Sequence, residues 1–454
     1  MLGLALLLVL LSAACVATIR APASALGLFI GLFGIEQWAQ ISHPVFVRHS
    51  VFMNFVIGGM LALGLSVIVY RGRPLLRGYN GVGILVLLLL VYAAVSMSWA
   101  PRTDLSMKAY VTAMPYLISG VLLGPLLINK TRDLEDAFKW LIIAGGGACF
   151  VLLFFAEWGV RGVLIPGTLN SYGGTGSANP LATAQVAGYV VIASALGGAW
   201  KESRFWAIAR WVVVAICLAV IVRTGSRGQL IGTVTGCMIL WPLTQPKGGI
   251  RNALTLAIIA LMFALIINLA LSQFSDQAAR WGGRRFAEEA QGRFHAGFHM
   301  VSHWWSASGT AILLGLGNGA SSDPRILGAY PHMVPMEVLS EEGVIGVVML
   351  ISIIYLASEA GIKTLKALRI DGGARSRVAV VMAMFVASFV LTCKQGSLVS
   401  SYDFFFFAIL LGRIWKLQRA ENSSDSVMKA AIVARGTMAM FSIDRRSSDK
   451  ARSP

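Results

Sequence analysis

Long apolar runs, separated by short polar connections, follow one another along most of the chain. Most runs have about 17 to 22 residues, the length that a helix needs to cross the hydrocarbon core of a bilayer. They do not alternate residue by residue as the strands of an outer-membrane barrel do. The runs that predict membrane-crossing helices cover residues 2–18, 23–37, 52–70, 82–99, 109–128, 138–156, 181–200, 205–222, 228–243, 253–272, 344–359, 378–395 and 402–415. We therefore expect an all-α, polytopic membrane protein.

The number of crossings depends on the first two runs. If residues 2–37 cross once, the chain has about twelve transmembrane helices and begins in the cytoplasm; if they cross twice, it has about thirteen and begins outside. Residues 2–18 lack the charged start of a signal peptide, and another apolar run follows at once. That arrangement indicates a retained helix.

Composition supports a membrane protein. The chain has 454 residues, of which 56% are hydrophobic and 13% charged, whereas a soluble domain carries about 25% charged residues. All five cysteines fall inside apolar runs, which is typical of small core residues rather than of extracellular disulfides.

Lysine and arginine gather in every second connection. The clusters are Arg71, Arg73 and Arg77; Lys130, Arg132 and Lys139; Lys201, Arg204 and Arg210; Lys247 and Arg251; Lys363, Lys366, Arg369, Arg375 and Arg377; and Arg413, Lys416 and Arg419. In a bacterial inner-membrane protein such clusters stay in the cytoplasm. This explains the net charge of +17 without a nucleic-acid partner. The connections 100–108, 157–180, 223–227, 273–343 and 396–401 are then periplasmic, and the C-terminus is cytoplasmic.

Two parts of the chain follow from this pattern. Residues 1–415 form one transmembrane bundle, which includes the long outer segment 273–343. That segment is too long for a simple connection, so we expect it to carry helices of its own. Residues 416–454 form a basic cytoplasmic tail, rich in Ser, Arg and Asp and disordered in part.

The first group with candidate chemistry is the outer connection Arg223-Thr-Gly-Ser-Arg-Gly228. Topology alone disfavours two arginines on this side, and the two glycines permit a close backbone approach. One interpretation is an anion clamp made by Arg223 and Arg227, with Ser226 as a further donor. The other is a pair of arginines that snorkel to lipid headgroups.

The long outer segment contains five arginines and no lysine: Arg280, Arg284, Arg285, Arg293 and Arg325. A guanidinium group suits bidentate recognition of phosphate or carboxylate. His295, His299 and His303 follow at four-residue spacing and share one helix stripe. No acidic or cysteine ligand is in phase with them, so we expect no metal site but a stripe that faces headgroups or sugar. Trp304 and Trp305 fit an interfacial belt or a sugar-stacking surface.

Four ionisable residues precede the apolar run at 344, namely His332, Glu337, Glu341 and Glu342. Charges at a membrane boundary are costly and often functional. His332 suits a general base or a switchable donor, or else a helix cap. Glu337 and Glu341 share a helix face; the acidic residues also favour the N-terminal end of the helix that follows.

Two further segments are loops. Gly315-Leu-Gly-Asn-Gly319 lacks the lysine of a phosphate-binding loop and predicts a backbone turn. Residues 172–180 predict an irregular outer loop. Asn179, at its end, either donates to a sugar or phosphate or caps the helix that begins at Pro180.

The order of these groups resembles that of the O-antigen ligase and O-antigen polymerase superfamily of bacterial envelope glycosyltransferases. The resemblance lies in Ser226-Arg227-Gly228, Gly292-Arg293, the tryptophans, Gly315, Gly317 and Gly319, and then His332, Glu341, Gly343 and Gly346. It implies a GT-C-like fold and a polyprenyl-diphosphate-linked glycan donor at the periplasmic face. It also implies transfer without a nucleotide sugar, metal or other cofactor.

The resemblance implies roles for individual residues. Arg227 and Arg293 would hold the diphosphate, and His332 would activate the acceptor hydroxyl. We expect further substrate contacts from a wider set: Arg223, Ser226, Asn179, Glu337, Glu341 and Trp305. The expected function is an O-antigen ligase, which joins polysaccharide to lipid A–core. The alternative within the family is an O-antigen or exopolysaccharide polymerase, and outside it a transporter of lipid-linked sugars.

Overall fold

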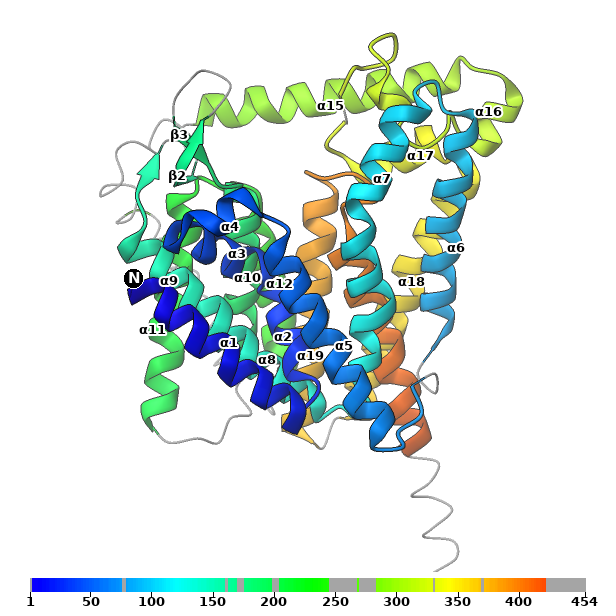
Figure 1. The fold of residues 1–454 in the computed structure, drawn as a ribbon. Helices are drawn as coiled ribbons and strands as arrows, with labels where there is room; N and C mark the ends of the chain where they lie inside the picture. Colours follow the sequence, from blue (N-terminus) through cyan, green and yellow to red (C-terminus); the bar gives the residue numbers. More distant parts are fainter. Residues whose placement is uncertain are drawn as a thin grey trace, which may run out of the picture.

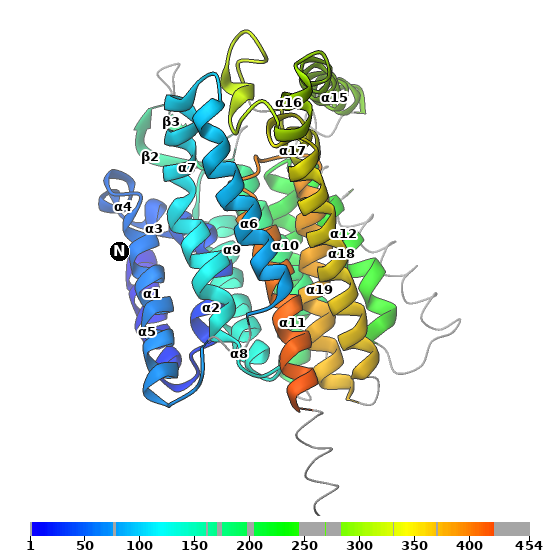
Figure 2. The same ribbon diagram turned by 90° about the vertical axis from the view of Figure 1, so that its right-hand side faces the viewer.

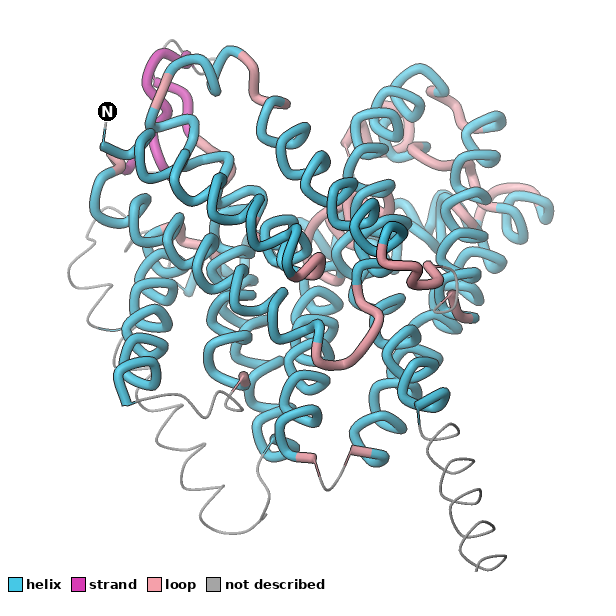
Figure 3. Tube along the Cα trace, turned by 60° about the horizontal axis from the view of Figure 1, so that its bottom comes forward, coloured by secondary structure: helices cyan, strands magenta, loops and turns pink. Residues whose placement is uncertain are grey.

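Long helices that run between two ends of the molecule make up nearly all of the computed structural model (Figure 1). The structure describes residues 2–75, 79–159, 162–169, 175–197, 204–244, 268, 283–329, 331–368 and 371–421. Coloured by secondary structure, the described chain consists mainly of helices joined by loops, with a few strands at one edge (Figure 3). The predicted all-α membrane protein is thus confirmed as a predominantly helical chain with helices of membrane-spanning length.

The helices of the first half carry the labels α1 to α9. They are α1 (Leu2–Arg20), α2 (Ser24–Ile30), α3 (Leu32–Ser42), α4 (Pro44–Arg48), α5 (Phe52–Tyr70), α6 (Gly81–Ser96), α7 (Thr103–Leu117), α8 (Asp133–Trp140) and α9 (Gly146–Phe155). A π-helical turn extends α7 just after Pro115, where proline removes a helical hydrogen bond. A second π-helical segment, Leu141–Gly145, joins α8 to α9.

The helices of the second half follow from residue 180 onward. They are α10 (Pro180–Leu196), α11 (Arg204–Arg223), α12 (Arg227–Thr244), α15 (Gly283–Trp305), α16 (Gly309–Leu314), α17 (Val334–Glu341), α18 (Gly343–Ala367), α19 (Gly372–Thr392) and a last helix over residues 402–421. That last helix continues past residue 415, where we had expected the tail to begin.

Seven helical segments within the described ranges are long and apolar enough to cross a membrane. They are Gly3–Arg20, Phe52–Tyr70, Gly81–Trp99, Thr103–Leu127, Asp133–Phe155, Gly343–Ala367 and Gly372–Thr392. Each overlaps a predicted span, whereas Pro180–Leu196 is shorter than the predicted 181–200. The predicted 253–272 lies outside the described residues.

The predicted single helix over 23–37 is wrong. The chain breaks at Gly31 into α2 and α3. At Gly27 a Cβ would lie 2.1 Å from the Ala137 carbonyl oxygen, so α2 packs against the backbone of α8. Glycines in this run lower its helix propensity, and the close packing supports the broken form.

Hydrogen bonds join the connections at each end of the bundle. At the end where α15 lies, Asn318 N donates to Ser96 Oγ (3.0 Å) and Leu398 N to Glu337 Oε1 (3.1 Å). At the opposite end, Arg413 Nε donates to the Ile128 carbonyl (2.6 Å). We call these the α15 end and the opposite end. The described parts of the five connections predicted to be periplasmic lie at the α15 end (Figures 1 and 2).

A small antiparallel sheet lies at the α15 end, where we had expected only an irregular loop. Its order is β1 (Trp158–Gly159), β2 (Gly162–Leu169) and β3 (Thr175–Ser177). Val163 and Ile165, two residues apart, are both buried against Leu152, as one face of a strand requires. Of the three strands, only β3 lies within residues 172–180, where we had expected an irregular loop.

Close packing between α12 and α19 positions the candidate site. A Cβ at Gly236 would lie 2.6 Å from the Ala383 carbonyl oxygen, and one at Gly232 would lie 3.1 Å from that of Ala387. Small residues at four-residue spacing let two helix backbones approach in this way. The α15-end termini of α12 and α19 are therefore held side by side.

Candidate functional site

The first turn of α12 meets the segment that follows α19. A Cβ at Gly228 would lie 2.4 Å from Lys394 Nζ, so the Lys394 ammonium lies against the turn that begins at Arg227. Gln229 Nε2 donates to Gln395 Oε1 at 3.0 Å and strengthens the same junction. Cations are unfavourable at a helix N-terminus, whereas an anion there is stabilised.

Arg293 of α15 reaches the same segment. Its Nη1 donates to the Lys394 carbonyl oxygen at 3.3 Å. Gly297, one turn further along α15, makes this approach possible, since a Cβ there would lie 2.3 Å from Met336 Sδ. The α15 helix, which crosses the end of the bundle (Figure 1), thus places Arg293 over the termini of α12 and α19.

His332 lies beside Arg293 in an unusual backbone conformation. It is the non-glycine residue with positive φ (+60°) within the described chain, a region that costs energy for most side chains but is more accessible to His. The residue is half-buried. Burial, and then the charge of Arg293, lower the pKa of His332 below 6.5, so its imidazole is neutral near pH 7 and can accept a proton.

A cavity of about 770 Å³ begins at Gln395, the residue that follows Lys394, although neither Arg227, Arg293, His332 nor Lys394 itself lines it. Its wall is formed by α7, α10, the end of α19 and the segment 395–403, and it includes the Gln395 side chain that bonds to Gln229. The wall carries many hydroxyl and amide groups among apolar ones: Thr112, Tyr116, Asn179, Gln185, Ser322, Ser388, Thr392, Gln395, Ser397, Ser400, Ser401 and Tyr402. A lining of this kind offers many hydrogen bonds to a polar ligand.

One buried carboxyl group and a pair of aromatic rings mark one part of the cavity. Asp403 accepts hydrogen bonds from Gln185 and Tyr189. Tyr116 and Tyr402 stack with ring centroids 5.3 Å apart and an angle of 17° between planes. Carboxylates and aromatic faces are the groups with which proteins hold sugar rings, through hydroxyls and C–H faces respectively. Lys108 of α7 adds one cation to the wall.

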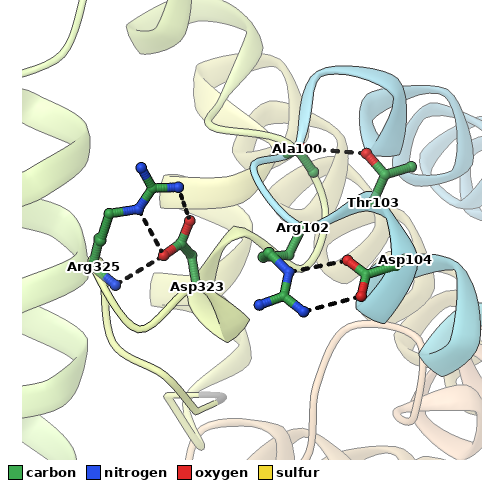
Figure 4. Close-up of polar contacts among 6 residues, drawn as sticks. All are labelled: Ala100, Arg102, Thr103, Asp104, Asp323 and Arg325. Carbon is green, nitrogen blue, oxygen red and sulfur yellow. Dashed lines mark hydrogen bonds and ion pairs between the residues drawn. The ribbon is translucent and has the colours of Figure 1, made fainter.

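The rim of the cavity carries two ion pairs, drawn in Figure 4. Arg102 forms a two-pronged pair with Asp104 (both contacts 3.0 Å), and Arg325 pairs with Asp323 (3.0 Å). The neighbouring Leu105 and Ser322 line the cavity. Each pair joins residues two positions apart, and exposed pairs of this kind contribute little stability.

Ser226, Arg223 and Asn179, which we had expected to contact the substrate together, are not gathered in one site. Ser226 is buried, and its Oγ donates to the Pro180 carbonyl at 3.4 Å. Arg223 donates to the Leu153 carbonyl (3.2 Å), and its guanidinium lies 4.9 Å from the centre of the Trp158 ring. Arg223 is therefore directed toward α9 and the sheet. Asn179 caps α10 through Leu181 N at 3.0 Å and also lines the cavity.

Three glutamates that precede α18 hold the loops of the α15 end together. Glu341 accepts hydrogen bonds from the backbone of Gly319 (2.6 Å) and Ser321 (2.9 Å). Glu342 accepts one from Asn318 Nδ2 (3.0 Å), and Glu337 accepts one from Leu398 N (3.1 Å). All three are at most 4% exposed. Glu337 and Glu341, which we had expected to contact substrate, are instead occupied by backbone N–H groups and do not line the cavity.

Burial changes the protonation of these glutamates. It raises the pKa of Glu337 and of Glu341, and it raises the pKa of Glu342 to about 8. The two main-chain donors at Glu341 oppose this rise, as hydrogen bonds to a carboxylate do.

The glycines at 315–319 form the predicted turn. Gly315, Gly317 and Gly319 have φ between +80° and +95°, which favours glycine strongly. A Cβ at Gly315 would lie 2.0 Å from the Glu341 carbonyl oxygen. These glycines therefore serve the close approach of backbone to the Glu341 segment.

On α15, the remaining predicted residues lie at the surface. Trp305 is 69% exposed, and His295, His299 and His303 are exposed as well. Trp304 is buried and donates to the Ala311 carbonyl at 3.0 Å. Within the part of the chain that the structure describes, no three His, Cys, Asp or Glu side chains are grouped to hold a metal ion.

Several residues of the site were missed by the analysis of sequence. Lys108 and Lys394 are single lysines at the α15 end, and neither belongs to a basic cluster of the sequence. Lys394 stands at the outer end of the predicted span 378–395. Topology disfavours a cation at that end, as it does for Arg227, so the same argument indicates a functional role for Lys394. Asp403 stands at the start of a predicted span, where an acidic residue is a functional signal.

A scan against protein-family models found no match to this chain, and a search of curated proteins found none. The class that the structure defines is a helical protein with several helices that can cross a membrane and a polar cavity beside a group of cations at one end. The function must therefore be argued from that geometry.

Proposed function

We propose that the protein transfers a glycan from a polyprenyl-diphosphate donor to an acceptor hydroxyl. The observation that carries the proposal is the contact of Arg293 with the Lys394 segment at the first turn of α12, with His332 within reach of the Arg293 charge and a cavity of about 770 Å³ that begins at the next residue, Gln395. The proposal places the diphosphate on the cations and the acceptor sugar in the cavity. The expected product is polysaccharide on lipid A–core, as an O-antigen ligase makes.

The cations serve the leaving group. During transfer, the bond from the anomeric carbon to the phosphate oxygen breaks, and its electron pair stays on the diphosphate. Fixed positive groups stabilise that developing charge, and each such preorganised donor contributes about 3 kcal/mol. Arg293 and Lys394 are held by their contacts with α19 and α12 before any substrate binds, which is the preorganisation that this effect requires.

His332 serves the nucleophile. The acceptor hydroxyl attacks the anomeric carbon and loses its proton, which passes to the neutral imidazole of His332. Burial, and then the charge of Arg293, lower the pKa of His332 and keep the base unprotonated before the substrates bind. General base catalysis of this kind accelerates reactions about 10²- to 10⁴-fold.

The cavity serves the acceptor. Reacting atoms must come within about 3–3.5 Å of each other, so the acceptor sugar must bind next to the diphosphate. Asp403 and Gln185 offer hydrogen bonds to its hydroxyls, and the stacked rings of Tyr116 and Tyr402 offer an apolar face.

The proposed setting is the bacterial inner membrane, with the α15 end in the periplasm and the C-terminus in the cytoplasm. Basic clusters support this orientation, because Arg71, Lys130 and Lys366 lie in or next to connections at the opposite end and cytoplasmic connections are rich in Lys and Arg. The lipid-linked donor would then reach the cations from the periplasmic leaflet.

The test is transfer by the purified chain in detergent with a polyprenyl-diphosphate glycan and lipid A–core. We expect Arg293→Ala and Lys394→Ala each to lower kcat by about 10²–10³. Arg325→Ala is the matched control, since its side chain is 84% exposed at the same end and should leave the rate within about twofold. Full turnover by Arg293→Ala would end the proposal.

The acceptor decides between the two family activities. Offered lipid A–core and free lipid-linked repeat units in parallel, a ligase consumes the first and a polymerase elongates the second. Transfer to lipid A–core alone supports the ligase. Elongation of the lipid-linked repeat units alone would indicate a polymerase, and the proposed roles of Arg293 and His332 would be unchanged.

A further inference from the structure

An apolar groove lies on the lateral surface near the opposite end, far from the proposed active site. It has a volume of about 270 Å³ and lies between α8, the segment Leu141–Gly145 and α11. Its lining is Lys139, Ile142, Ile143, Trp206, Ala209, Arg210 and Val213. The groove therefore combines an apolar floor with two cations.

Arg210 is the unusual member of this lining. It stands about two turns into the apolar helix α11, and it is half-buried. Its guanidinium lies 5.7 Å from the centre of the Trp211 ring. Its Nε atom is buried without a hydrogen-bond partner, and no carboxylate pairs with Arg210 among the residues that the structure describes. A partly buried charge of this kind is costly unless an anion meets it.

Lys139 supplies the second charge of the groove. It pairs with Glu135 on its own helix at 3.0 Å, and Glu135 also meets Arg377 at 3.4 Å. Asp136, three residues before Lys139, also interacts with its charge. Lys139 is therefore balanced by carboxylates of its own helix, and Arg210 is the cation that the groove offers to a ligand.

Side chains around the groove face lipid. Trp206 is 50% exposed, Ile208 66%, Val212 52% and Ile143 47%. Exposed apolar side chains along membrane helices contact acyl chains, and tryptophan favours the headgroup level. The groove thus presents apolar contacts along α11 beside the guanidinium of Arg210.

We infer that this groove binds an anionic phospholipid, whose phosphate accepts hydrogen bonds from Arg210 and whose acyl chains lie along Ile142, Ile143 and Val213. A guanidinium fits a phosphate through two parallel hydrogen bonds. Basic pockets between membrane helices at the cytoplasmic side recognise anionic headgroups in the same way. The site is independent of the proposed glycan transfer.

The experiment uses the full-length chain, purified and stripped of lipid in detergent. Native mass spectrometry follows binding of phosphatidylglycerol and of phosphatidylcholine with the same acyl chains. We expect phosphatidylglycerol to bind about tenfold more tightly, and Arg210→Gln to remove that preference, which is the size of one charge-assisted contact. Lys363→Gln is the matched control, because Lys363 is an exposed cation of α18 at the same end, paired with Glu359.

Equal binding of the two lipids to the wild-type chain would overturn the inference, as would an unchanged preference in Arg210→Gln. A second measurement covers the case in which that variant fails to fold. Phosphatidylglycerol with a photoreactive acyl chain is cross-linked to the wild-type protein, and the modified peptides are mapped. Cross-links to residues 139–143 and 206–213 support the site, and cross-links confined to other helices refute it.

Discussion

Glu342 offers the sharpest test of how the α15 end is stabilised. The carboxyl group is fully buried, one oxygen accepts from Asn318, and the other has no hydrogen-bond partner within the described residues. Burial raises its pKa from 4.5 to about 8. The folded state therefore favours the protonated form, which Glu342→Gln reproduces permanently with nearly the same shape.

The sign of the pH dependence follows from these values. Between pH 4.5 and about 8, the unfolded chain has lost this proton while the folded chain keeps it. The contribution of Glu342 to the free energy of unfolding is fully present below pH 4.5 and is lost as the pH rises toward 8. Between about pH 5.5 and 7.5 the loss amounts to about 2–3 kcal/mol, since each unit of pKa difference corresponds to 1.36 kcal/mol.

The assay is thermal unfolding of the wild-type and Glu342→Gln proteins in the same detergent, at about pH 5.5 and pH 7.5. Glu337 and Glu341 add pH dependence of the same sign. They are present in both proteins, so the difference between wild type and Glu342→Gln isolates the contribution of Glu342. We expect the midpoint of the wild type to fall more steeply with pH, and the variant to gain on it at the higher pH. A variant that is equally destabilised at both pH values would refute the buried, protonated state of Glu342.

Three further outcomes are expected. Gly317→Ala should lower the free energy of unfolding by more than about 1 kcal/mol, because φ at Gly317 is +95° and a Cβ would lie 2.7 Å from Ala100 Cα. Gly58→Ala is the control in the same unfolding experiment and should be neutral, since a Cβ at Gly58 would have no atom within 4 Å. The acid limb of kcat/KM for transfer should have its midpoint below 6.5, since the pKa of His332 is lowered, and a midpoint above that value would contradict its role as base. Asp403→Asn should raise the acceptor KM about tenfold with little change in kcat, and an unchanged KM would remove the cavity from acceptor binding.

The helices, and the grouping of their connections at two ends, were accessible from the sequence. The predicted 52–70 coincides with α5, and the predicted 228–243 falls inside α12. Apolar length and alternating basic clusters are local properties, so they can be read without knowing which helix packs on which. The sheet and the break at Gly31 were not predicted, because short strands and interrupted helices depend on neighbours distant in the chain.

For the candidate site, the sequence indicated the arginines and His332 but not their companions. Lys394 joins them only because Gly232 and Gly236 bring α12 against α19. Glu341 lost its expected substrate contact for a similar reason, since the turn at 317–321 supplies it with two N–H donors.

The sequence by itself determined a helical protein with apolar spans, its two chemically distinct ends and the residue types at one of them. Only the tertiary structure decided that Asp403 meets Gln185 across a cavity and that Arg413 is buried against the carbonyl of Ile128, residues more than 200 positions apart. The physical reason is that apolar length and charge distribution act locally along the chain. The partner of a polar side chain, and hence its role, is set by which distant backbone comes within hydrogen-bond reach.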